Sequence, residues 1–131
     1  MTENKTKLHQ KTFSIAWGDM DALGHVNNGK YFDYFQEARI EWLQTLDLDL
    51  NQPFGPVVIH VAATFYKPVK YPATVDIITQ LNEVGRTSLE LLHLLKLDGQ
   101  LMAEGISKVV WVDYKKNKSH PLPEQITKLI D

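Results

Sequence analysis

The chain has 131 residues, 44% of them hydrophobic, and its 14 basic and 16 acidic residues give a formal net charge of −2. This length predicts one domain with a packed core, over residues 1–131. The balanced charge excludes a global field that would attract nucleic acid or an anionic membrane, so we expect neither partner. The absence of cysteine excludes disulfides, thiolate zinc sites and a cysteine nucleophile.

The N-terminal region is polar and basic. Residues 1–11 lack the hydrophobic segment of a signal peptide, and no apolar run approaches the roughly 20 residues needed to span a bilayer. We therefore expect a cytoplasmic protein whose residues 1–10 are flexible. Large apolar residues alternate with small ones over residues 13–17, and this pattern predicts a short first strand.

A long helix is predicted from Lys30 to about Leu46. Apolar residues recur at helical intervals at Tyr31, Phe35, Ala38, Trp42 and Leu46. Further apolar residues widen this surface well beyond one stripe, so the helix should be buried on most sides. Two prolines and a glycine at residues 53–56 then predict a loop.

Four strands are predicted after the loop, at residues 57–66, 74–81, 87–97 and 101–112, because apolar residues follow a period of two. Asp98-Gly99 predicts a tight hairpin between the last two. Leu92, Leu94, Val109 and Trp111 are expected on the outer face of the sheet, where self-association would bury them. Residues 121–131 predict one short terminal helix.

This order of elements predicts an α+β fold. Four strands in succession without intervening helices must be mainly antiparallel, and one buried helix requires a sheet that covers it. We therefore expect a curved antiparallel sheet of five strands wrapped around one long central helix.

The most concentrated set of reactive side chains lies at residues 17–31, between the first strand and the helix. This stretch contains two carboxylates, an imidazole and two carboxamides. Asn27 and Asn28 offer N-cap chemistry, and the free N–H groups of the first helical turn would face the same loop. Hydrogen-bond donors beside a carboxylate suit chemistry on a carbonyl group.

Residues 19–28, of sequence DMDALGHVNN, and the following Tyr31 resemble the signature of hotdog-fold acyl-CoA thioesterases of the 4-hydroxybenzoyl-CoA thioesterase type. Residues 65–69 and 85–88 are similar to two further segments of that family. The resemblance implies a hotdog fold, with two protomers joined edge to edge and dimers often paired again into a homotetramer. It also implies hydrolysis of an acyl-CoA substrate without metal or cofactor, at sites formed between protomers.

Carried over to this chain, the resemblance makes Asp21 the catalytic carboxylate, as nucleophile or as the base that activates water. The backbone N–H of Asn28 would polarise the thioester oxygen, and the side chains of His25 and Asn27 could position water or substrate. Asn27 could instead only cap the helix, and His25 could only orient the loop. Asp19 is expected to be structural, because an aspartate before a turn commonly binds nearby backbone N–H groups.

Substrate-binding candidates lie elsewhere in the chain. The resemblance implies that Arg86, Thr87 and Ser88 bind the phosphates of CoA, with Lys67 as a further candidate, although turn residues and surface charges often have no such role. Tyr31 is expected either in the core or in the acyl pocket. Two other readings stay open: an acyl-ACP thioesterase, and a non-catalytic protein that binds acyl thioesters.

Overall fold

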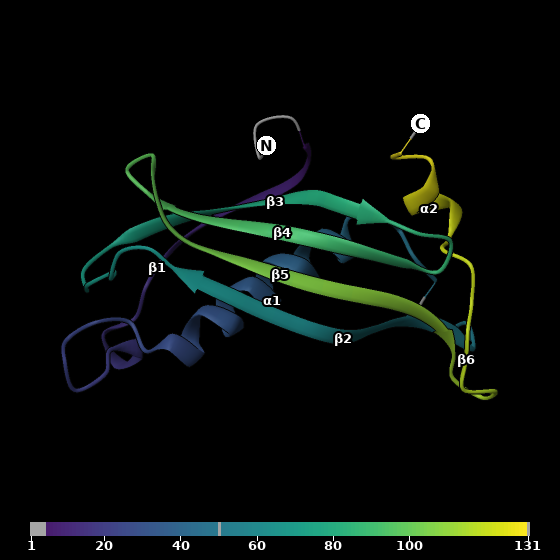
Figure 1. Cartoon of the computed structure of the whole chain (residues 1–131), viewed down its shortest axis with the longest axis horizontal. Coiled ribbons are helices and arrows are strands. Elements are labelled where there is room, and N and C mark those ends of the chain that lie inside the picture. The colour runs from purple at the N-terminus through teal and green to yellow at the C-terminus, as the bar shows by residue number, and fades with distance from the viewer. Residues whose placement is uncertain (1–4, 50, 131) are drawn as a thin grey trace.

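The computed structural model describes residues 5–49 and 51–130. Figure 1 shows a single layer of strands with one long helix lying against one of its faces. The elements in chain order are β1 (Thr6–Ser14), the 3-10 helix η2 (Trp17–Asp19), α1 (Asn28–Gln44), β2 (Phe54–Phe65), β3 (Thr74–Val84), β4 (Ser88–Leu97), β5 (Gln100–Asp113), β6 (Lys118–Ser119) and α2 (Glu124–Thr127).

The strands form one antiparallel sheet in the order β1-β3-β4-β5-β2, and the two-residue β6 extends it beside β5. The sheet therefore has the five predicted strands, with β6 as an addition. The first strand was predicted in the wrong place, because β1 ends at Ser14 and Trp17 belongs to η2. α1 contacts both edge strands, β1 and β2, as well as β3. Because the two edges of five strands lie about 19 Å apart along a sheet, contact with both requires the sheet to curve around the helix.

The buried side of α1 carries side chains three or four residues apart, as the sequence pattern predicts. Tyr31, Phe35 and Ala38 join a core cluster around the first half of the helix, and Trp42 joins a second cluster with Leu89, Val109 and Trp111. The prediction that the helix is buried on most sides is wrong for one face. Asp33, Gln36, Glu37 and Ile40 are exposed there, because no second layer of the described chain covers them.

The hairpin between β4 and β5 confirms the predicted Asp98-Gly99 turn. Both residues have positive φ angles, 51° and 81°, as a two-residue turn of this type requires. The register that follows pairs Leu89 with Val109. Directly paired residues share a face of the sheet, so Val109 lies on the core face together with Leu89.

The predicted outer face is therefore partly wrong. Val109 and Trp111 are only 1% and 2% exposed and belong to the core around α1. Leu92 and Leu94 lie in neither core cluster, and each is already 4% exposed in a single chain. Burial of these leucines therefore does not require a second copy of the protein.

The two ends of the described chain also differ from expectation. β1 begins at Thr6 and pairs with β3 from Thr6 to Ser14, so residues 6–10 form ordered strand; residues 1–4 lie outside the described part. The predicted C-terminal helix is confirmed as the short α2, whose Ile126 is buried. Among the described residues, no helix is long and apolar enough to cross a membrane.

Candidate active site

The polar segment between β1 and α1 folds as a very tight hairpin. Its outer rung is the hydrogen bond from the Asn27 N–H to the Asp19 carbonyl, at 2.9 Å, and the next is an antiparallel bridge between Met20 and Val26. At its tip, the Asp21 N–H donates to the carbonyl of His25 at 2.7 Å. The second arm of the hairpin runs directly into α1, so the loop and the helix N-terminus form one unit.

Asp21 lies where this hairpin turns. Its Oδ1 atom accepts hydrogen bonds from the N–H groups of Leu23, at 2.9 Å, and His25, at 3.3 Å. Its Oδ2 atom has no hydrogen-bond partner in the described part of the chain, and the residue is half-buried. Two backbone donors thus orient the carboxylate while one oxygen is left available to a substrate or a water molecule.

The N-terminus of α1 continues the second arm of this hairpin. Asn27 is the N-cap residue, and its Oδ1 accepts the N–H of Gly29 at 2.8 Å. Its main-chain carbonyl accepts the N–H of Lys30 at 2.9 Å. The N–H of Asn28 has no partner among the described residues, which leaves one donor free at the positive end of a helix of 17 residues.

The structure thus brings together four of the sequence candidates: Asp21, His25, Asn27 and Asn28. Capping the helix accounts for the side chain of Asn27. The backbone of His25 both donates to and accepts from Asp21, which supports a part in shaping the loop. Its imidazole makes no hydrogen bond within the described chain.

A hollow of about 510 Å³ lies against the outer side of this hairpin, and Asp21 is one of its walls. Trp17 and Tyr71 also line it, and their side chains are 75% and 47% exposed. The sequence reasoning did not select either residue. Trp17 immediately precedes the polar motif, whereas only tertiary folding brings Tyr71 to it.

Tyr31 lies in the core rather than on an open surface. It is 2% exposed, and its ring meets that of Phe65 edge to face at a centroid distance of 4.9 Å. Burial raises the pKa of its hydroxyl, and a hydrogen bond with the backbone of Val69 partly opposes this shift. Of the two alternatives for Tyr31, the structure favours the core.

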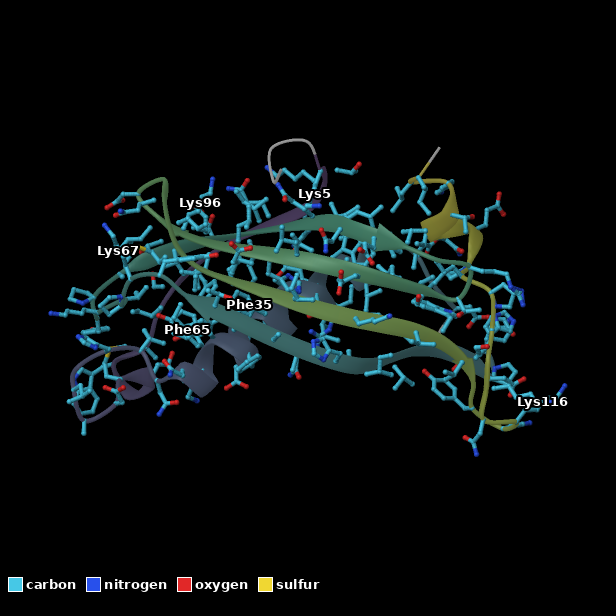
Figure 2. The ribbon with its side chains drawn as sticks, viewed as in Figure 1. Lys5, Phe35, Phe65, Lys67, Lys96 and Lys116 are labelled. Atoms are coloured by element: carbon cyan, nitrogen blue, oxygen red, sulfur yellow. The ribbon has the colours of Figure 1, made fainter. Side chains whose placement is uncertain are left out.

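The proposed CoA-binding residues are split between the two ends of the molecule. Figure 2 shows Lys67 at the end where α1 begins, and this residue is exposed. Arg86, Thr87 and Ser88 follow β3, whose 11 residues run away from that end over about 33 Å. Within one chain, these three residues therefore do not meet Asp21.

The β3–β4 turn has structural contacts of its own. The carbonyl of Arg86 accepts the N–H of Leu122 at 3.0 Å, and the carbonyl of Thr87 accepts the N–H of Trp111 at 2.8 Å. The backbone of this turn thus holds the C-terminal segment against the sheet. Its side chains are still free to serve another purpose, since Arg86 is exposed.

His60 and His93 lie in separate environments. His60 is exposed on β2, whereas His93 is fully buried between the hydroxyls of Thr79 and Ser107, at 3.0 Å from each. Burial, and to a lesser extent the charge of Arg39, lowers the pKa of His93 to about 3. Among residues 5–49 and 51–130, no three His, Asp or Glu side chains are grouped to hold a metal ion.

Comparison with known proteins adds independent evidence. The family model described as the thioesterase-like superfamily matches residues 15–130. The long-chain acyl-CoA thioesterase FadM of Escherichia coli K12 is 25% identical over 129 residues, which cover 93% of this chain and 96% of FadM. The acyl-CoA thioesterase YbgC of Haemophilus influenzae is 25% identical over 117 residues, covering 86% of each chain.

Solved structures agree with these sequence matches. The PA2801 protein of Pseudomonas aeruginosa superposes with a TM-score of 0.89 at 41% identity, covering 96% of this chain and all of that one, 100%. The BH1999 gentisyl-coenzyme A thioesterase has a TM-score of 0.80 at 25% identity, covering 90% of this chain and 98% of its own. From the matched family model, the relatives and the shared architecture, the chain belongs to the thioesterase-like superfamily and has the hotdog fold.

Proposed function

We propose that the protein hydrolyses acyl-CoA thioesters to a free acid and CoA. The observation that carries the proposal is the hairpin of residues 19–27, which presents the oriented carboxylate of Asp21 and continues into the N–H of Asn28, a donor with no partner among the described residues. Thioester hydrolysis needs both parts: a group that attacks or activates water, and a donor for the carbonyl oxygen. Membership of the thioesterase-like superfamily supports the same class of reaction.

In this mechanism, the thioester oxygen lies against the N–H of Asn28 at the positive end of α1. Asp21 acts in one of two ways. As a base, it takes a proton from water while the hydroxyl adds to the carbonyl carbon; the C–S bond then breaks and the CoA thiolate leaves and is protonated. As a nucleophile, its Oδ2 adds to the same carbon, the C–S bond breaks, and the CoA thiolate leaves and is protonated; water then cleaves the acyl anhydride, which releases the free acid and restores the Asp21 carboxylate.

CoA is the proposed carrier because FadM, YbgC and the BH1999 protein are all named for acyl-CoA or CoA thioester substrates. Lys67 is the proposed contact for the phosphate groups at the Asp21 end. An acyl-ACP thioesterase and a non-catalytic acyl-thioester binding protein are the alternatives. Retention of a carboxylate at position 21 supports turnover over simple binding.

We further propose a homodimer in which two β2 strands meet edge to edge, with a homotetramer formed from two such dimers. β2 lies at one edge of the sheet, and Val57, Val58, Ile59 and Val61 are 38–58% exposed there. An unpaired apolar edge strand is a template for pairing with another chain. Antiparallel pairing would carry the partner's β3–β4 turn toward the Asp21 end, and with it Arg86, Thr87 and Ser88.

The activity is tested by release of free thiol from short, long, branched and aromatic acyl-CoAs. Asp21→Asn should lower the rate about 10²–10⁴-fold, the usual contribution of a positioned acid or base. Asp98→Asn is the matched control, because it makes the same chemical change at an exposed turn that accepts asparagine. Equal rates in Asp21→Asn and wild type would refute the assignment.

The carrier and the binding alternative are separated by two further measurements. Wild-type protein that hydrolyses acyl-ACP but no acyl-CoA would be an acyl-ACP thioesterase. Binding of acyl-CoA in calorimetry without release of thiol would identify a binding protein.

The dimer is tested by light scattering at fixed protein concentration. Wild type should give at least twice the monomer mass of 15.0 kDa. Ile59→Lys should lower that mass toward the monomer, because it places a charge on the apolar edge. A wild-type monomer would exclude the shared site.

A further inference from the structure

Asp19 connects more parts of the candidate site than any local turn requires. Its Oδ2 accepts the hydroxyl of Tyr34 at 2.7 Å and the N–H of Ala16 at 3.3 Å. Its Oδ1 lies 3.8 Å from the Nζ of Lys30, and its main-chain carbonyl accepts the N–H of Asn27 at 2.9 Å. These four partners come from the N-cap of η2, the N-cap of α1 and the first two turns of α1.

The contact with Tyr34 distinguishes Asp19 from a simple turn aspartate. The bond to Ala16 spans three residues and only stabilises η2, whereas the shorter bond to Tyr34 spans 15 residues and joins the loop to the helix. Tyr34 is 7% exposed, and its ring packs on that of Phe13 at a centroid distance of 4.9 Å. Packing of the ring therefore fixes the position of the hydroxyl that donates to the Asp19 carboxylate.

The chemistry of this bond makes it persistent. A hydrogen bond to an ionised carboxylate is roughly twice as strong as one between neutral groups, and the side chain of Asp19 is only 17% exposed. Burial, followed by the bond to Asp19 itself, raises the pKa of Tyr34, so its hydroxyl keeps its proton at any ordinary working pH.

The geometry points to Asp19 as a positioning residue that sets the separation between the Asp21 carboxylate and the Asn28 N–H. Asp21 follows Asp19 by two residues, and Asn28 follows Asn27, which Asp19 holds through its carbonyl. The hydrogen bond to Tyr34 and the longer ion pair with Lys30 attach the same unit to the body of α1. This inference rests on the proposed function, since it assigns Asp19 a part in the same reaction.

The proposal predicts a defect in kcat rather than in substrate binding. A displacement of about 1 Å between reacting groups can cost about 10²-fold in rate, so Asp19→Asn should lower kcat about 10–100-fold with little change in KM. Tyr34→Phe removes only the hydroxyl and should give a smaller fall in kcat. Because the two residues act through one bond, the double variant should be no slower than Asp19→Asn.

The experiment measures kcat and KM on the best acyl-CoA for wild type, Asp19→Asn, Tyr34→Phe, the double variant and the Asp98→Asn control. Amide hydrogen exchange of residues 20–28 gives a second readout, and exchange should accelerate in Asp19→Asn and Tyr34→Phe. Asp19→Glu, which keeps the carboxylate, should recover part of kcat. If Asp19→Asn does not fold, Tyr34→Phe alone decides the question, since it leaves the ring packing intact.

Three results would overturn the inference. The first is full kcat in both Asp19→Asn and Tyr34→Phe while Asp21→Asn is inactive, which would leave the proposed function standing. The second is a raised KM with unchanged kcat, which would make Asp19 a binding residue. The third is a double variant whose fold-loss in kcat equals the product of the losses in Asp19→Asn and Tyr34→Phe. Full activity of Asp21→Asn would instead refute the proposed function itself.

Discussion

Burial of His93 should make the stability of the fold depend on pH. The imidazole is fully buried and lies 3.0 Å from both the Thr79 and Ser107 hydroxyls. The ring of Phe35 stacks on it at 5.4 Å, and the guanidinium of Arg39 donates to the same Ser107 hydroxyl at 3.0 Å. A second positive charge in this place would be shielded from solvent and would have no carboxylate partner among the described residues.

The direction and size of this pH dependence follow from the pKa of His93 in the folded and unfolded chain. The pKa of His93 is about 3 in the folded chain, against 6.5 for an unperturbed histidine. This difference in pKa corresponds to about 5 kcal/mol in the free energy of unfolding. Between these values only the unfolded chain binds the proton. The stability supplied by neutral His93 is thus complete above pH 6.5 and falls by about 1.4 kcal/mol for each pH unit below it, until about pH 3.

Urea unfolding between pH 7 and pH 4.5, at one protein concentration, measures this effect. The free energy of unfolding of wild type should fall with pH more steeply than that of His93→Gln, by about 1.4 kcal/mol per pH unit below 6.5. His60→Gln, at an exposed histidine, should keep the wild-type slope. Parallel curves for wild type and His93→Gln would refute the reasoning.

Three further substitutions test the packing. Gly105→Ala should lower the free energy of unfolding, measured in urea, by about 1–3 kcal/mol, because a Cβ there would lie 2.5 Å from two ring carbons of Phe35. Adding Phe35→Leu should restore part of this loss. A double variant no more stable than Gly105→Ala would contradict the contact. Gly24→Ala should cost about 1–2 kcal/mol and slow thiol release, because Gly24 has a φ of +79° at the hairpin tip; Gly24→Asn should cost less. Trp42→Ala should cost about 3–5 kcal/mol, whereas Trp17→Ala, at 75% exposure, should change the melting temperature little.

The parts of the fold predicted correctly depend on local chemistry. The spacing of apolar residues along α1 identifies its buried side, because an α-helix repeats every 3.6 residues whatever it packs against. Asp98-Gly99 identifies a hairpin, because both residues tolerate positive φ. The segment from Asp19 to Asn28 likewise predicts a polar loop and a helix cap at Asn27, because these depend on hydrogen bonds between near neighbours, whereas its folding as a hairpin was not predicted.

Other predictions failed where the pattern was ambiguous or polar. Residues 6–10 contain few apolar side chains, yet they form β1 because their backbone pairs with β3. The period of two over residues 57–66 predicts the strand β2 but not its exposure, because β2 lies at the sheet edge, with an irregularity between Val58 and His60, and Val57, Ile59 and Val61 are exposed.

What the sequence by itself determined is the helix, the Asp98-Gly99 turn and the polar segment that carries Asp21, because each follows from the backbone preferences and spacing of neighbouring residues. Tertiary structure alone decided the register that places Trp111 in the core, the bond between Asp19 and Tyr34, and the location of Arg86 at the far end from Asp21. These features depend on which distant segments pair, and side-chain period alone does not specify pairing partners.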